Sequence, residues 1–170
     1  MNHYTRLARK AIETYLNDKK VLGQTADLPE EMTQRKAGVF VSLHKNDELR
    51  GCIGTIYPSQ NNLADEIIQN AISAATKDMR FYPLDLSELP IIHISVDILS
   101  EPIEAVKEDL DIKKYGIIVK NQNKTGVLLP DIDGIDSVDQ QISIACEKAG
   151  IISEVDGYQL YKFIVKRYSE

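Results

Sequence analysis

Residues 39–56 carry the pattern that most constrains the fold, because they predict two strands joined by a tight turn. Residues 39–44 and 48–56 are rich in the apolar and β-branched side chains typical of strands. Asn46 and Asp47 lie between them, and both residue types tolerate the left-handed backbone of a two-residue hairpin turn. The segment therefore predicts an antiparallel β-hairpin.

Three segments predict helices. Residues 4–19 have an amphipathic pattern. In residues 63–77 the apolar side chains fill one half of the helix and every polar residue lies on the other half, so this helix should lie flat on a sheet, with Asn62 as its N-cap. Ser137 and Gln140 form a capping box that opens a third helix, which Gly150 ends.

The remaining segments complete an α+β pattern. Gly116 is expected to close a short helix, and Gln122 lies in the turn of a second hairpin. Because hairpins supply most of the strand pairing, we expect an α+β fold with a mainly antiparallel sheet flanked by helices. The other expected segments are a surface loop at 23–32, a strand at 91–99, the short helix at 108–115, hairpin strands at 116–120 and 125–129, and a last strand at 158–168.

Length and composition limit the class of protein. The 170 residues suit one domain, or one domain with a lobe packed against it. Asp and Glu outnumber Lys and Arg by 26 to 20, and this acidic balance disfavours nucleic acid as a partner. No apolar run approaches the roughly 20 residues that span a bilayer, and the first residues lack a signal-peptide pattern. Cys52 and Cys146 form no Cys-x-x-Cys pair, so we expect a reducing, cytoplasmic location.

Motifs for metals and cofactors are not found. His3, His44 and His93 are scattered, and the acidic loop at 131–136 fails the EF-hand spacing. Glycine-rich nucleotide loops and the Gly-x-Ser-x-Gly motif are missing as well. We therefore expect neither a metal site nor a bound cofactor.

The most unusual stretch is Leu-Arg-Gly-Cys-Ile-Gly at residues 49–54. Strand alternation places Arg50, Cys52 and Gly54 on one face, and an arginine beside a thiol stabilises the nucleophilic thiolate. A lone cysteine in a strand is otherwise a small core residue. Glycines within a strand allow close approach to the backbone. With a two-residue turn, His44 should face away from Cys52, which disfavours a Cys–His dyad, whereas a one-residue shift of the register would place both on the same face.

Arg80 and Phe81 form a second candidate group after the helix at 63–77. An arginine there can cap helix carbonyls or pair with an acidic residue, which is a structural role. It can also bind a carboxylate or phosphate in bidentate fashion.

The chain resembles the AMMECR-type domain family, also called AmmeMemoRadiSam system protein A. The hallmark is the sequence at 49–54, and the segments at 38–44, 78–84, 126–130 and 148–150 resemble further family motifs. Met79 stands where the family often has Pro, and Asp131 where many members have Gln. The resemblance implies a two-lobed α+β fold with the hallmark strand near a cleft between the lobes. It also implies association with a Memo-like protein or domain and a radical SAM protein.

Two functions are compatible with these residues. In the first, the protein is an enzyme or enzyme component in which Cys52 is nucleophile or carrier and Arg50 binds an anion or stabilises the thiolate. In the second, it is a non-catalytic module that binds a small ligand, a peptide or a partner protein. For both we expect the same ligand contacts, namely Gly51, Ile53, Gly54, Arg80, Phe81 and Pro130.

Overall fold

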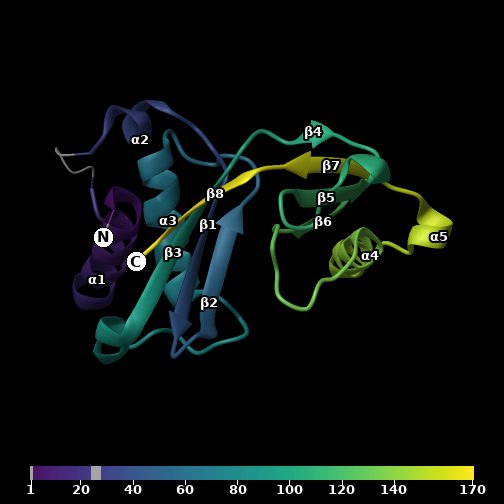
Figure 1. The fold of residues 1–170 in the computed structure, drawn as a ribbon. Coiled ribbons are helices and arrows are strands. Elements are labelled where there is room, and N and C mark those ends of the chain that lie inside the picture. Colours follow the sequence, from purple (N-terminus) through teal and green to yellow (C-terminus); the bar gives the residue numbers. More distant parts are fainter. Residues whose placement is uncertain (1, 24–27) are drawn as a thin grey trace. The chain divides into compact units, whose positions relative to one another are not determined.

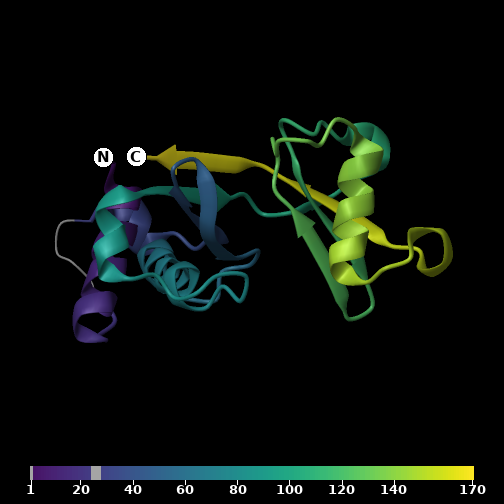
Figure 2. The same cartoon turned by 90° about the horizontal axis from the view of Figure 1, so that it is seen from below.

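The structure, a computed structural model, describes residues 2–23 and 28–170. It divides into two compact units, one of Met1–Leu99 with Lys166–Glu170 and one of Ser100–Val165 (Figures 1 and 2). Each unit has an antiparallel sheet and helices, which confirms the predicted α+β fold. Among the described residues, no helix is long and apolar enough to cross a membrane.

The first unit contains a four-stranded sheet in the order β2-β1-β3-β8. Strand β1 pairs antiparallel with both β2 and β3. Asn46 and Asp47 have φ values of 52° and 66°, so both adopt the left-handed backbone that the turn requires, and the first hairpin is confirmed. The strands are β1 (Val39–Lys45), β2 (Glu48–Thr55), β3 (Ile92–Leu99) and β8 (Val165–Ser169).

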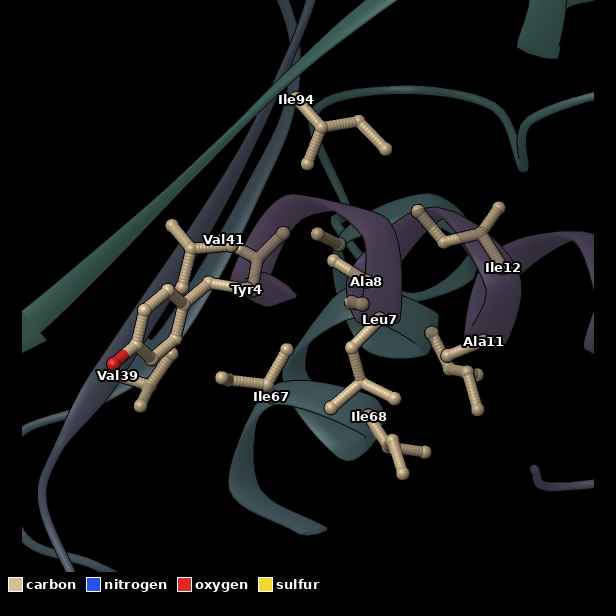
Figure 3. Close-up of a cluster of buried hydrophobic side chains, with 14 of the residues drawn as sticks. Tyr4, Leu7, Ala8, Ala11, Ile12, Val39, Val41, Ile67, Ile68 and Ile94 are labelled. Atoms are coloured by element: carbon tan, nitrogen blue, oxygen red, sulfur yellow. The ribbon is translucent and has the colours of Figure 1, made fainter. Parts of the chain in front are cut away.

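Two helices cover one face of this sheet and bury the main core (Figures 1 and 2). Figure 3 shows side chains of α1 and α3 meeting those of β1 and β3, including Ile12, Ile67, Val41 and Ile94. The N-caps are Asn2 and Asn62, whose side chains accept hydrogen bonds from first-turn N–H groups. The helices of this unit are α1 (His3–Asp18), α2 (Glu30–Gln34) and α3 (Leu63–Thr76), with a 3-10 helix η1 (Leu86–Ile91).

Helix α3 is buried on more than its apolar half. The side chain of Glu66 accepts hydrogen bonds from Thr55 Oγ1 at 2.6 Å and from the N–H of Ser59 at 2.7 Å. Asn70 donates to the carbonyl of Val39 at 3.1 Å. The predicted helix on the sheet is therefore confirmed, and these partners in β1, in β2 and after β2 allow Glu66 and Asn70 of its polar half to be buried as well.

The second unit has a sheet in the order β4-β7-β5-β6, with α4 packed on β5 and β6. The second hairpin is confirmed, with a tighter turn than expected. Ser137 caps α4, and Gly150 ends it with a left-handed φ of 64°. The elements are β4 (Ile103–Glu104), η2 (Lys107–Asp109), β5 (Gly116–Asn121), β6 (Lys124–Leu128), α4 (Val138–Ala149), α5 (Ser153–Asp156) and β7 (Gln159–Phe163).

Three sequence predictions need correction. The single strand expected at 158–168 is two strands, β7 and β8, which belong to different sheets and are separated at Ile164. The helix expected at 108–115 is the short η2 followed by a turn. Gly116 begins β5, where it pairs with Phe163 of β7, instead of ending a helix. Glycine suits this position because a Cβ would lie 2.3 Å from the Phe163 ring.

The loop expected at 23–32 is interrupted by α2. Residues 24–27 of that prediction lie outside the described residues. Met32 on α2 is fully buried in the main core, so its apolar side chain fixes a turn of helix where the acidic and proline residues indicated a surface loop.

Gly51 generates a test of this packing. A Cβ at Gly51 would lie 2.3 Å from the carbonyl oxygen of Ala74 in α3, and backbone atoms of a packed helix cannot move aside cheaply. We predict that Gly51→Ala lowers the free energy of unfolding by about 3 kcal/mol in urea denaturation. Gly23→Ala is the matched control, since no atom lies within 4 Å of its added Cβ. Equal stability of the two variants would contradict this packing.

Candidate functional site

Arg50 lies at an irregularity in β2. Leu43 of β1 pairs with Gly51, whereas His44 pairs with Leu49, so Arg50 is an extra residue without a partner in the ladder. Its guanidinium binds both carboxylate oxygens of Glu88, at 3.2 Å and 2.9 Å, and donates to the carbonyl of Tyr82 at 2.9 Å. The expected pairing of Arg50 with the Cys52 thiol is replaced by these contacts, because the bulge interrupts the simple alternation of the strand.

Glu88 joins β1 and β2 to the 3-10 helix η1. Lys45 Nζ lies 2.9 Å from Oε1, and the N–H of Asp85 donates to Oε2 at 3.2 Å. The hydrogen bonds from Arg50, helped by Lys45, lower the pKa of Glu88 to about 2. Glu88 is therefore a charged anchor that fixes the segment leading into η1.

Asp78 and Arg80 cover the outer edge of β2. The Asp78 carboxylate, 5% exposed, accepts from the N–H of Cys52 at 2.9 Å and from Arg80 at 3.0 Å and 2.7 Å. The bidentate Arg80 and the Cys52 N–H hold the pKa of Asp78 well below its usual range. Because β2 is an edge strand, this ion pair takes the place that a neighbouring strand would occupy. Arg80 therefore pairs with an acidic residue, as its structural interpretation predicted.

The Cys52 thiol lies on the sheet face beside Ser42, its cross-strand partner. The Ser42 hydroxyl donates to Sγ at 3.2 Å. Burial raises the pKa of the Cys52 thiol, and Ser42 and Arg80 offset this only in part. His44 is two residues from Ser42, so it lies on the same face of the sheet as Cys52. The prediction that His44 faces away from Cys52 is wrong, because the bulge at Arg50 shifts the pairing register.

A surface pocket of about 680 Å³ opens next to these anchors. Met79 and Tyr82 are 100% and 91% exposed. The Arg80 guanidinium stacks over the Phe81 ring at 5.4 Å from its centroid. The pocket is lined by Arg50, Met79, Arg80, Phe81, Tyr82 and Pro83.

The structure brings together only part of the predicted site. Arg50, Arg80 and Phe81 line the pocket, whereas Ile53 packs against the core. A Cβ at Gly54 would lie 2.2 Å from the Phe40 ring, and a Cβ at Gly51 would lie 2.3 Å from the Ala74 carbonyl of α3. Protein atoms therefore fill the space next to both glycines, where a ligand was expected. Pro130 is buried and belongs to the second unit.

Sequence reasoning missed the anchors and the exposed side chains around the pocket. Asp78, Glu88, Met79 and Tyr82 carry no periodic pattern, because they lie in or beside irregular segments. One signal was present, since the segment at 78–84 that resembles a family motif contains Asp78, Met79 and Tyr82. No group of three His, Cys, Asp or Glu side chains suited to a metal ion occurs within residues 2–23 and 28–170.

Comparisons with known proteins agree with this fold. The AMMECR1 family model matches residues 5–169, and the chain belongs to the AMMECR1 family. A Thermotoga maritima protein is 49% identical over 168 residues, covering 97% of this chain and 96% of the relative. A Clostridium acetobutylicum protein is 48% identical over 98% of this chain, but the chain spans only 36% of its length.

A solved structure is also similar. The crystal structure of an uncharacterized protein from Pyrococcus horikoshii matches with a TM-score of 0.88 and 32% identity, covering 98% of this chain and 89% of that one. The family resemblance is therefore confirmed over nearly the whole chain, and the family name brings no activity with it.

The environment of Cys52 generates a prediction about reactivity. Because burial raises the pKa of its thiol, we expect alkylation of the folded protein by iodoacetamide at pH 7 to be slower than that of an unfolded cysteine. Mass spectrometry across a pH series measures the rate at each cysteine, with the buried Cys146 as internal reference. Rapid modification of Cys52 at pH 7 would revive the thiolate mechanism.

Glu88 generates a prediction about acid stability. Its folded-state pKa is lowered, so its stabilising contribution is complete above the unfolded value near 4.5 and is lost as the pH falls toward about 2. Between pH 5 and pH 2.5, the wild type should lose about 2 kcal/mol more unfolding free energy than Glu88→Gln, in parallel urea titrations. Identical losses in the two proteins would mean that Glu88 does not form these ion pairs in solution.

Proposed function

We propose that this protein is a binding module that uses the pocket beside residues 79–83 to hold a partner protein. The observation that carries the proposal is the exposure of Met79 and Tyr82, two large side chains held on a backbone that is anchored at both ends. Exposed apolar groups gathered at one place are typical of interaction sites.

The anchoring is what distinguishes this segment from an ordinary surface loop. Asp78 fixes its start to β2 through the Cys52 N–H, and Arg50 fixes the Tyr82 carbonyl at its end. The N–H of Leu84 donates to the carbonyl of Ala75, which ties the segment back to α3. A segment held in this way loses little conformational entropy on binding, and it therefore binds a partner more tightly than a flexible segment would.

The partners that we propose are the Memo-like protein or domain and the radical SAM protein that the family resemblance implies. We place this association in the cytoplasm, as the cysteine usage favours. The alternative of a covalent enzyme requires a Cys52 thiolate, which burial disfavours, and an anion site at Arg50, whose guanidinium is engaged by Glu88 and Tyr82.

The test measures binding of the purified chain to each of the two partner proteins from the same organism by calorimetry. Met79→Ser combined with Tyr82→Ser should weaken binding at least tenfold without changing the melting temperature, because both side chains project into solvent. The control is Val21→Ser, which removes another exposed apolar side chain of the same unit, 60% accessible. Absence of binding by the wild type, or equal binding by all three proteins, would overturn the proposal.

A further inference from the structure

One edge of the Arg80 guanidinium makes no hydrogen bond within the described residues, and the inference drawn from it rests on the proposed function and extends it. Nε and Nη2 are engaged by Asp78, and Nη2 also lies 3.5 Å from the Cys52 carbonyl. Nη1 has no hydrogen-bond partner among the residues that the structure describes, and the Arg80 side chain is 59% exposed to solvent. The group is thus oriented on one edge and available on the other.

The chemistry of the pocket lining favours a negatively charged ligand group. Of the six lining residues two are arginines and none is acidic. Asp78 and Phe81 fix the plane of the Arg80 guanidinium, so that its Nη1 hydrogens keep one direction. Arg80 keeps its full positive charge beside Asp78 and Phe81, because arginine stays protonated in proteins.

A carboxylate fits this edge better than a phosphate does. Phosphate presents three strong acceptor oxygens and needs several donors, whereas Nη1 is the one unengaged nitrogen of Arg80. The other lining side chains are Met79, Phe81, Tyr82 and Pro83, which suit an apolar group next to the charge. Arg50 contributes positive charge, but its side chain is only 17% exposed and each of its three nitrogens already donates to Glu88 or Tyr82.

We propose that Arg80 binds an acidic side chain of the partner protein, and that an apolar side chain adjacent to it in the partner fills the space between Met79 and Tyr82. A protein segment is favoured over a free metabolite because a small-molecule site buries most of its ligand, whereas Met79 and Tyr82 are almost wholly exposed. A flat protein surface can cover both side chains at once.

The first test uses the partner that binds the wild type. Arg80→Gln should weaken binding about tenfold and reduce its dependence on salt, and Arg80→Lys should retain part of both because it keeps the charge. If the Met79/Tyr82 double variant weakens binding but Arg80→Gln does not, the carboxylate inference fails while the proposed function stands. If neither variant weakens binding, both fail.

A second test needs no variant and therefore does not depend on the Asp78 ion pair surviving substitution. The wild type is titrated with two blocked tripeptides, acetyl-Leu-Glu-Phe-amide and acetyl-Leu-Gln-Phe-amide, while the backbone amides of Arg80, Phe81 and Tyr82 are followed by NMR. The glutamate peptide should shift these resonances and the glutamine peptide should not. Equal shifts, no shift with either peptide, or the same response to free acetate would overturn the inference.

Discussion

The hydrogen bond from the Cys52 N–H to the Asp78 carboxylate is the contact on which the candidate site depends. Cys52 lies in the edge strand β2, and Asp78 follows the end of α3, so a single bond of 2.9 Å joins the sheet, the helix and the start of the pocket segment. The same carboxylate orients Arg80 through two further bonds. Without Asp78, the N–H of Cys52 would lack a partner and residues 79–83 would lose their fixed starting point.

Two local features of β2 make this arrangement possible. Gly51 has no Cβ, so the Ala74 carbonyl can approach the strand, which brings the end of α3 close to β2. The bulge removes Arg50 from the ladder and directs its guanidinium to Glu88 and Tyr82. Residues 50 and 51 thus serve close packing and anchoring, and apart from Arg50 the pocket is lined by the segment at 79–83.

Much of this fold could be predicted from local patterns, and the site could not. The hairpin at Asn46 and Asp47 and the caps at Asn62 and Ser137 depend on short-range backbone preferences that the sequence displays. The bulge at Arg50, the burial of Glu66 and the division of the last strand at Ile164 depend on partners distant in sequence. Periodicity contains no information about such partners, and for that reason the Arg50–Cys52 pair was expected and the Asp78 anchor was missed.

Hydrogen exchange at the β2 edge tests the central claim most directly. By the alternation of the ladder, the N–H groups of Cys52 and Gly54 both face away from β1, but only that of Cys52 has a hydrogen-bond partner among the described residues. Exchange of the Cys52 amide should therefore be much slower than that of Gly54, and Asp78→Ala should abolish the difference. Equally fast exchange at both amides in the wild type would contradict an edge closed by Asp78 and an anchored pocket segment.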